Sequence, residues 1–426
     1  MRLYSTLQRE KVDLPPPPGP IRMYFCGPTV YARAHVGNAR PFVVGMWLRN
    51  WLRARGYDAT LVHNITDIND KIYRAAGDGS SAELAAQATQ WYLDDTEALG
   101  LGMPDHLPRA TESVQQIVRF IAALIERGHA YEASGDVYFR VASYPEYGEL
   151  SRQRLDAVEG QDEEDRPNPL KLDPRDFALW KANKPDEDTS WDSPWGRGRP
   201  GWHIECSAMA EELLGPAFEI HGGGLDLVFP HHENELAQSR ALGHAFAHVW
   251  VHNGMLRFTG TKMSKSEGNV VSIREALDEW GRETFLLFLM TGHWSKPIDF
   301  SEVTMNQARA QLDTFRNALL GDGDGRGDWA ELEAVLDDDF NTPDALAVLH
   351  RWRAAGARED LRRGLELFGI GAAVAEAPDA VRSLAEDRLR ARAERAFDEA
   401  DRLRAAIEEH GWEVRDVADG FQLVPK

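Results

Sequence analysis

The segment IRMYFC at residues 21–26, followed by GPT at residues 27–29, decides the fold class of this chain. The first six residues form a short apolar and aromatic run that predicts a buried β-strand, and the next three predict a turn. A helical pattern follows over residues 37–55 and a second apolar strand over residues 57–65. This order predicts a βαβ unit with a parallel sheet, and therefore an α/β protein. Such sheets bind ligands at the carboxyl ends of their strands, where Cys26 lies.

Changes of composition divide the rest of the chain. The proline run at residues 15–20 cannot be helix or central strand, so we expect the fold to start after it. Residues 82–131 have a helical pattern, and residues 137–195 are polar and rich in Pro, Asp and Trp. The polar stretch is typical of a module inserted into the sheet domain. That domain resumes with a predicted strand at residues 218–221 and a predicted helix at residues 231–242.

The C-terminal part contains two breaks. Residues 321–327 are a Gly- and Asp-rich hinge inside a helical region, and residues 374–378 are a second break of mostly small residues. After the second break, residues 381–409 predict one charged helix, and residues 411–424 alternate as a hairpin does. The breaks predict that the chain folds as several units.

Charge and cysteine content exclude several classes of protein. A formal net charge of −21 excludes a protein that coats nucleic acid non-specifically, because such binding needs clustered Lys and Arg. We see neither an apolar stretch that approaches a membrane span nor a signal peptide, so we expect a cytoplasmic protein that binds no membrane. Cys26 and Cys206 are the only cysteines, which excludes a disulfide framework. They are thiols in the core, metal ligands or a catalytic group.

The segment PTVYARAHVGN at residues 28–38 joins the first predicted strand to its helix. It sets His35 and Asn38 near a helix N-terminus, where backbone N–H groups and the helix dipole favour a phosphate. Gly37 allows a nucleotide to approach the backbone closely. Taken alone, a polar turn with a capping histidine is the more common explanation of this pattern.

A second candidate nucleotide element is the segment KMSKS at residues 262–266, between Gly260 and a Gly-Asn turn. Lys262 and Lys265 on a glycine-flanked loop can clamp phosphates, and nucleotidyl transfer relies mainly on such cations. Taken alone, the segment is better explained as an ordinary solvated Lys/Ser loop. The ordered pair of HVGN and KMSKS is much more specific than either segment.

Metal ligation is the third candidate chemistry. His231 and Glu235 lie four residues apart and share a face of the predicted helix, although His232 and Glu235 are a competing pair. With Cys26 and Cys206, one His and one Glu make a four-ligand site that can accept a substrate ligand. A capping His-His-Glu and two core thiols remain the alternative.

Five segments carry a resemblance to one family. They are CGPTVY at 26–31, NITDI at 64–68, GWHIECSAM at 201–209, HGGGLDLVFPHHENE at 221–235 and KMSKS at 262–266. Together they resemble the cysteinyl-tRNA synthetases, which are class I aminoacyl-tRNA synthetases. The resemblance implies that zinc is held by Cys26, Cys206, His231 and Glu235, and so selects His231 over His232.

The resemblance also implies roles for other residues. It implies a substrate pocket that includes Gly27, Thr29, Thr66 and Trp202. It implies that ATP is bound and activated by His35, Gly37, Asn38, Lys262 and Lys265. In the arginine-rich tail, it places three residues near the anticodon of tRNA: Arg392, Arg404 and Asp416.

The family's organisation is expected here as well. It implies a Rossmann-like parallel-sheet catalytic domain at residues 1–250, with a connective module inserted at about residues 100–200. A domain that carries the KMSKS loop follows at residues 251–310, an α-helical bundle at 311–377 and a small anticodon-binding unit at 378–426.

The implied reaction is ATP-dependent activation of L-cysteine to cysteinyl-adenylate and transfer to the 3′ end of tRNA(Cys). One Zn²⁺ per chain would bind the substrate thiolate, ATP would enter with Mg²⁺, and we expect a monomer. The alternative is a tRNA-independent cysteine ligase of the mycothiol pathway, which shares the zinc and ATP elements. The PTVY wording of the first segment and the arginine-rich C-terminal helix count against that alternative.

Overall fold

The computed structural model describes residues 1–154, 168–258, 261–262, 271–321, 323–371, 377–417 and 420–425. The chain forms two compact units. Unit 1 contains Met1–Arg309 and Trp329–Val348, and unit 2 contains Ala310–Asp328 and Leu349–Lys426. No helix in the described ranges is long and apolar enough to cross a membrane.

The core of unit 1 is a parallel four-stranded sheet in the order β10-β9-β3-β4. Its strands are β3 (Pro20–Phe25), β4 (Asp58–His63), β9 (Ala217–Gly224) and β10 (Phe246–Asn253). Met23 of β3 lies between Leu61 and Ile220, and none of the three side chains reaches solvent beyond 1%. Both faces of the sheet are therefore covered, as is usual for parallel sheets. The strands expected from the sequence are confirmed.

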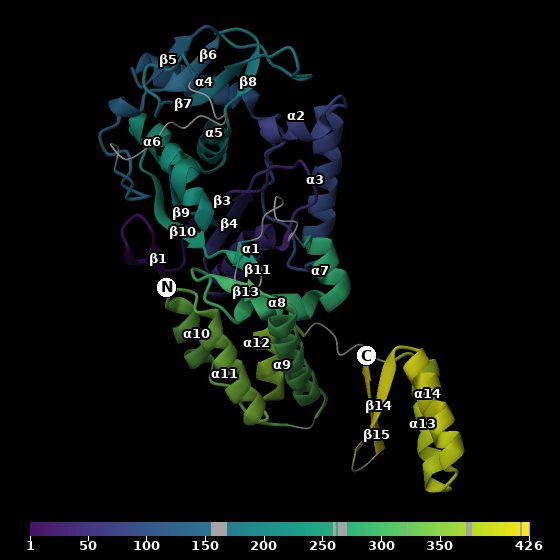
Figure 1. The fold of residues 1–426 in the computed structure, drawn as a ribbon. Helices are drawn as coiled ribbons and strands as arrows, with labels where there is room; N and C mark the ends of the chain where they lie inside the picture. The colour runs from purple at the N-terminus through teal and green to yellow at the C-terminus, as the bar shows by residue number, and fades with distance from the viewer. Residues whose placement is uncertain are drawn as a thin grey trace. The chain divides into compact units, whose positions relative to one another are not determined.

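Helix α1 (Val36–Ala54) connects β3 to β4 and completes the predicted βαβ unit (Figure 1). Its inward face carries Phe42, Val43, Met46 and Trp47, each at most 2% exposed. These side chains recur at three- and four-residue spacing, so one stripe of the helix packs on the sheet. The carboxyl end of β3 and the amino end of α1 are thereby fixed next to each other.

The insertion between β4 and β9 differs in part from the sequence-based prediction. It contains α2 (Asp70–Ala76), α3 (Ser81–Glu97), α4 (Val114–Glu126), the 3₁₀ turn Val141–Ser143 and α5 (Trp202–Leu214). An antiparallel sheet is formed by β5 (Ala130–Ala133), β6 (Asp136–Phe139), β7 (Phe177–Ala182) and β8 (Gly198–Pro200). The helical pattern predicted for residues 82–131 corresponds to two helices, α3 and α4, with a non-helical segment between them. Gly100 and Gly102 both have positive φ and end the helical path there.

The end of the sheet domain leads into short elements. After β9 come the 3₁₀ turn Leu225–Leu227, a π-type turn at Val228–His232 and α6 (Glu233–Ala241). The helix predicted at residues 231–242 thus begins two residues later, because Phe229 is extended. Beyond β10 lie β11 (Leu256–Phe258), β12 (Thr261–Lys262), α7 (Ile273–Trp280), α8 (Arg282–Met290) and β13 (Ile298–Phe300).

The N-terminal segment is structured, contrary to the expectation that the fold starts after the prolines. Strands β1 (Arg2–Ser5) and β2 (Glu10–Asp13) form an antiparallel hairpin. The hairpin is joined to β10, because Trp250 N–H donates to Ser5 Oγ at 3.0 Å and Thr6 N–H donates to Trp250 O at 2.9 Å. Polar residues on its outer face hide this strand pair from a hydrophobicity pattern.

The remaining elements are mostly helical. They are α9 (Glu302–Leu320), α10 (Trp329–Asp337), α11 (Thr342–Ala354), α12 (Arg358–Glu366), α13 (Asp379–Ala393), α14 (Phe397–Glu409), β14 (Trp412–Val417) and β15 (Gly420–Pro425). The hairpin predicted at the C-terminus is confirmed by β14 and β15. The single charged helix predicted for residues 381–409 is wrong, since Arg395 has a φ of 61° and separates α13 from α14. A core of Val381, Ala385, Ile407, Trp412 and Val414 holds helices and hairpin together.

Candidate active site

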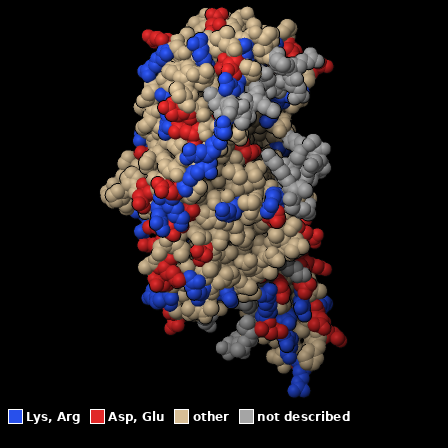
Figure 2. All heavy atoms as spheres, turned by 60° about the vertical axis from the view of Figure 1, so that its left-hand side comes forward, with Lys and Arg blue, Asp and Glu red and all other residues tan. Residues whose placement is uncertain are grey.

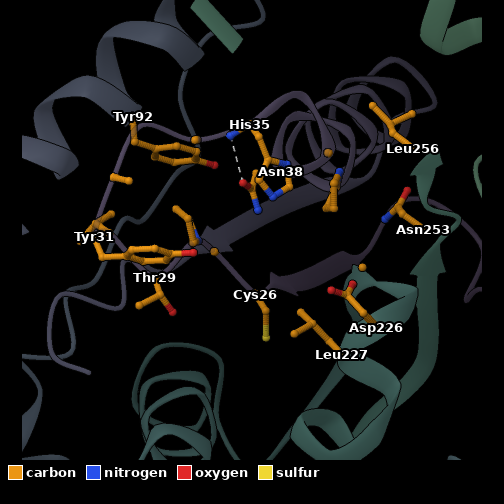
Figure 3. A pocket seen from close by; sticks show the side chains of 18 of the residues that line it. Cys26, Thr29, Tyr31, His35, Asn38, Tyr92, Asp226, Leu227, Asn253 and Leu256 are labelled. Atoms are coloured by element: carbon orange, nitrogen blue, oxygen red, sulfur yellow. Dashed lines mark hydrogen bonds between the residues drawn. The ribbon is translucent and has the colours of Figure 1, made fainter. Parts of the chain in front are cut away.

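A cavity of about 260 Å³ opens at the carboxyl ends of the parallel strands. Its walls include the end of β3, the turn before α1, and residues from α3, α5 and the segments that follow β9 and β10. Figure 3 shows Tyr31 and Tyr92 on one side of this cavity, and Asp226, Asn253 and Leu256 on the other. The site therefore occupies the edge of the sheet at which α/β proteins usually bind ligands.

The first sequence segment forms the turn into α1. His35 is the N-cap residue, and its backbone N–H donates to Asn38 Oδ1 at 3.2 Å (Figure 3). A Cβ on Gly37 would lie 2.8 Å from the His35 ring, so glycine lets the imidazole fold over the helix start. The predicted nucleotide residues His35, Gly37 and Asn38 are thus brought together beside the cavity and next to a helix N-terminus.

The segment predicted to bind substrate is tied together by one hydrogen-bond chain. Gly27 N–H donates to Asn64 Oδ1 at 2.9 Å, Asn64 Nδ2 donates to Thr66 Oγ1 at 3.2 Å, and Thr66 Oγ1 donates to Glu205 Oε2 at 3.0 Å. Glu205 and Thr66 are buried, at 0% and 1% exposure. A Cβ at Gly27 would lie 1.6 Å from Asn64 O, so no other residue fits there.

The remaining two candidates for substrate binding lie on opposite elements. Thr29 forms a parallel bridge with Thr66 and lines the cavity. Trp202 is the first residue of α5, lines the cavity and stacks on His231, with 4.2 Å between ring centroids and 18° between ring planes. The structure therefore brings Thr29 and Trp202 to the cavity, whereas Thr66 lies directly behind Thr29.

Four metal-ligand side chains converge beside the floor of the cavity. One donor atom from each of Cys26, Cys206, His231 and Glu235 lies within 4.8 Å of every other. The two sulfur atoms are 3.7 Å apart, Cys26 Sγ is 3.5 Å from Glu235 Oε1, and His231 Nε2 is 3.1 Å from the same oxygen. All four residues are at most 7% exposed. The tetrad expected from the resemblance is thus assembled from the end of β3, from α5, from the turn Val228–His232 and from α6.

The chemistry of this donor set fits a divalent cation. Burial raises the pKa of the Cys26 thiol well above its usual range, and the neighbouring Cys206 and Glu235 raise it further. Burial also lowers the pKa of His231 well below its usual range, so the imidazole is neutral and can offer a lone pair. Thiolate, imidazole and carboxylate are the ligands that zinc takes in proteins, and the ion would replace the protons that burial otherwise retains.

A second set of donors competes for the same position. One donor atom from each of Cys26, His221, His232 and Glu235 also lies within 4.8 Å of the others. His232 Nε2 is 3.3 Å from Cys26 Sγ, and His221 Nε2 is 2.8 Å from Glu235 Oε2. Only the first set uses both thiols. His232 and His221 also contact His252 and the Tyr24 carbonyl oxygen through their other nitrogens, at 2.7 and 3.0 Å. Such partners behind a ligand are common at metal sites.

Several residues of this region were not predicted from the sequence. His221, His252 and His203 surround the cluster, and burial lowers the pKa of His203 and of His252 to about 3. Tyr92 and His63 line the cavity from α3 and β4, joined by a 2.6 Å hydrogen bond. His221 begins the HGGG segment, but nothing in the spacing of the other residues places them near Cys26.

The second nucleotide segment is only partly described. Lys262 is the last residue of β12, and in the antiparallel pairing of β11 with β12 its backbone lies opposite Arg257. The side chain of Lys262 and all of Lys265 lie outside the described residues. The chain that follows returns to the first segment, because Val36 N–H donates to Val271 O and Ile273 N–H donates to Ala34 O, both at 3.0 Å.

The predicted tRNA-binding residues are exposed and belong to the C-terminal unit. Asp416 accepts hydrogen bonds from Arg392 and, at 2.8 Å, from Arg388. Arg404 instead pairs with Glu408 of its own helix at 3.3 Å. The structure therefore joins Arg392 to Asp416 but not to Arg404. On the face drawn in Figure 2, basic and acidic side chains are interspersed in small groups.

The match to a protein-family model first defines the class. The chain matches the family described as "tRNA synthetases class I (C) catalytic domain" over residues 15–310, and a DALR domain over residues 331–355. A methionyl-tRNA synthetase of Mycobacterium tuberculosis in complex with methionyl-adenylate shares the fold, with a TM-score of 0.56 at 14% identity, over 87% of this chain and 84% of that one. A putative arginyl-tRNA synthetase of Campylobacter jejuni gives 0.57 at 12% identity, over 83% and 93%.

Sequence comparison then defines the particular family. A cysteine–tRNA ligase of Alkalilimnicola ehrlichii is 43% identical over 98% of this chain and 97% of its own length. One from Jannaschia sp. is 45% identical over 97% and 95%. The chain belongs to the cysteine–tRNA ligase family, and it is a class I aminoacyl-tRNA synthetase that uses ATP. The Rossmann-like fold and the enzyme class expected from the sequence are confirmed, and the tRNA-independent ligase is not favoured.

Proposed function

We propose that the chain activates L-cysteine with ATP and Mg²⁺ and transfers it to the 3′ end of tRNA(Cys), with one Zn²⁺ held by Cys26, Cys206, His231 and Glu235. The observation that carries the metal assignment is the convergence of these four buried donors within 4.8 Å, beside a cavity that Cys26 itself lines. Four such groups without a cation are costly to bury, since each needs a partner in a dry site.

Zinc explains how cysteine is selected. A steric pocket discriminates poorly between near-isosteres such as cysteine and serine. When bound, Zn²⁺ deprotonates a thiol outright, whereas a serine hydroxyl is a harder and far less acidic ligand. Trp202 stacks on His231 at 4.2 Å and so holds this ligand's ring orientation from the side of the cavity. Thiolate affinity would then select the substrate without an editing step.

The rest of the pocket divides into two ends. We assign Gly27, Thr29, Thr66 and Trp202 to the substrate end, since the first two lie at the end of β3 and Trp202 is next to His231. His35, Gly37 and Asn38 are assigned to ATP at the N-terminus of α1, where backbone N–H groups favour phosphate. Lys262 and Lys265 complete the proposal as cations that follow charge developing on the phosphates.

The C-terminal unit is proposed to read the anticodon through Arg392, Arg404 and Asp416. Its support is the exposure of these side chains, at 41%, 52% and 45%, on a compact pair of helices and a hairpin. We also propose the domain division 1–250, 251–310, 311–377 and 378–426. We also propose that the protein is a cytoplasmic monomer, and its two free cysteines agree with a reducing compartment.

Aminoacylation with radiolabelled cysteine and total tRNA tests the proposed reaction. Label should appear on tRNA only when ATP is present. Label that stays off tRNA and joins a sugar amine instead would select the mycothiol-type ligase.

Cobalt substitution tests the metal separately. In protein loaded with Co²⁺ in place of Zn²⁺, adding cysteine should change the sulfur-to-metal charge-transfer band, whereas adding serine should not. A spectrum that does not respond to cysteine would show that the four side chains hold a purely structural ion or none.

A further inference from the structure

Two arginine or lysine side chains line the described walls of the cavity, and they lie on different elements. Lys71 of α2 places its ammonium 5.7 Å from the ring centroid of Trp202, on the side of His231 and the metal cluster. Arg33 belongs to the turn that leads into α1, two residues before the N-cap residue His35. ATP brings several negative charges to this turn, so Arg33 is the described cation on the phosphate side.

Arg33 is held by a buried carboxylate that neither nucleotide segment contains. Its NH1 donates to both oxygens of Asp95, at 2.8 and 3.0 Å, and the Asp95 side chain is 0% exposed. Arg274 of α7 donates to the same carboxylate through Nε at 3.1 Å. A carboxylate buried on α3 thus joins an arginine that precedes α1 to one that follows the KMSKS segment.

Backbone hydrogen bonds also hold the segments that carry Arg33 and Arg274. Residues 34–36 and 271–273 exchange two hydrogen bonds of 3.0 Å, and His35 forms a bridge with Ser272. Glu275 is close enough for the charge of Arg33 to contribute to the lowered pKa of its carboxyl, but hydrogen bonds with Ser272 are the main cause. Ser272 donates to Glu275 Oε2 through its N–H and its hydroxyl, at 2.8 and 2.7 Å. Glu275 is therefore committed to capping α7.

We propose that Arg33 binds the β- and γ-phosphates of ATP, which leave together as pyrophosphate. Both N–H groups of NH1 are used by Asp95, whereas Nε and NH2 have no hydrogen-bond partner in the described part of the chain. The side chain is 37% exposed and lines the cavity. Guanidinium donors that are oriented by a fixed carboxylate match phosphate oxygens in pairs.

A purely structural role is less consistent with the same contacts. Asp95 would keep a cationic partner if Arg33 were absent, because Arg274 donates to it independently. Without Arg33, the carboxylate would thus lose one of two cationic partners, and the ring of Trp91 would lose the guanidinium that lies 5.5 Å from its centroid. Because Arg274 remains at Asp95, a variant of Arg33 should still fold.

The test compares ligands that contain the β- and γ-phosphates with one that lacks them. In Arg33→Met, the Michaelis constants for ATP and for inorganic pyrophosphate in the exchange reaction should rise about 10- to 100-fold, as expected for a lost charged hydrogen bond. The inhibition constant of the sulfamoyl analogue of cysteinyl-adenylate should change less than about twofold, since that molecule has no β-phosphate. Arg33→Lys should recover part of the loss because it restores the charge.

The control is Arg119→Met, because Arg119 is 64% exposed, lies on α4 and does not line the cavity. All three constants should stay unchanged in this variant. An equal loss of affinity for the analogue, or unchanged constants for ATP and pyrophosphate in Arg33→Met, would overturn the proposal. The exchange reaction needs only ATP, pyrophosphate and cysteine. An error in the zinc assignment would therefore not weaken the binding of ATP and pyrophosphate while leaving the binding of the adenylate analogue unchanged.

Discussion

The metal cluster of unit 1 and the arginine group of unit 2 are both sets of polar side chains, but they differ in burial. Cys26, Cys206, His231 and Glu235 are at most 7% exposed. Arg392, Arg404 and Asp416 are between 41% and 52% exposed. Buried groups of this kind are costly unless they are hydrogen-bonded, paired or bound to a metal, whereas exposed ion pairs are nearly neutral in free energy. Convergence in a dry site therefore argues for a ligand, and convergence in solvent does not.

The largest expected effect tests this contrast directly. Cys206→Ser should lower the zinc content from one equivalent per chain and reduce cysteine-dependent pyrophosphate exchange by a factor of about 10²–10⁴, in line with the loss of a buried charge partner. Metal analysis and exchange kinetics on the same preparations measure both. Ser207→Ala is the matched control, since the Ser207 hydroxyl donates to the Gln238 side chain and to the Glu235 backbone oxygen and contacts none of the four donor atoms of the cluster. A serine variant that keeps its zinc and its rate would remove the basis of the comparison.

The next prediction concerns Lys265, a cation of the KMSKS segment. It is not part of the comparison between the metal cluster and the arginine group, because it lies outside the described residues. Lys265→Ala should lower kcat of cysteine activation by about 10²–10³, as for the loss of one preorganised contact to developing charge, with little change in KM for ATP. The reason is that a loop cation can follow the charge on the departing pyrophosphate. Steady-state exchange kinetics separate the two constants. A raised KM with unchanged kcat would assign Lys265 to ground-state binding instead.

Variants of two neighbouring histidines would show which of them is the metal ligand. If the ligand is His231, then His231→Gln should lose zinc as Cys206→Ser does. His232→Gln should weaken zinc binding by only about 10- to 100-fold, the usual effect of a residue behind a ligand. Competition with a chelator measures both affinities. The reverse order would show that the set with His221 and His232 holds the ion.

The sequence predicted those parts of the fold in which local pattern and tertiary burial agree. Apolar strands on both sides of an amphipathic helix specify the βαβ unit, and both strands and α1 appear within about two residues of their predicted bounds. The β1-β2 hairpin was missed because its stability comes from hydrogen bonds to β10, far away in the sequence. The break at Arg395 was missed because no Gly or Pro marks it.

The residues of the candidate site likewise fall into those that the sequence could predict and those that it could not. Cys26 and His35 are local features of one strand end and one helix start, so the sequence could single them out. His221, His252 and Asp95 act through contacts between elements that are distant along the chain. No spacing rule brings such residues together, and only the folded sheet does. Predicting them from one sequence would require the strand order, which the pattern does not contain.

The smallest expected effect concerns two arginines of α14 that look alike in the structure. Arg404 pairs with Glu408 and Arg402 with Glu399, both within the helix, and both arginines are more than half exposed. Arg404→Met and Arg402→Met should therefore each change the free energy of unfolding by less than about 1 kcal/mol. Only Arg404→Met should also raise KM for tRNA, by up to about tenfold, because one charged contact to RNA would be lost. Aminoacylation kinetics and thermal unfolding of the two variants measure the difference, and pyrophosphate exchange should be normal in both. Equal KM values for tRNA in the two variants would show that Arg404 contributes no more to tRNA binding than Arg402 does.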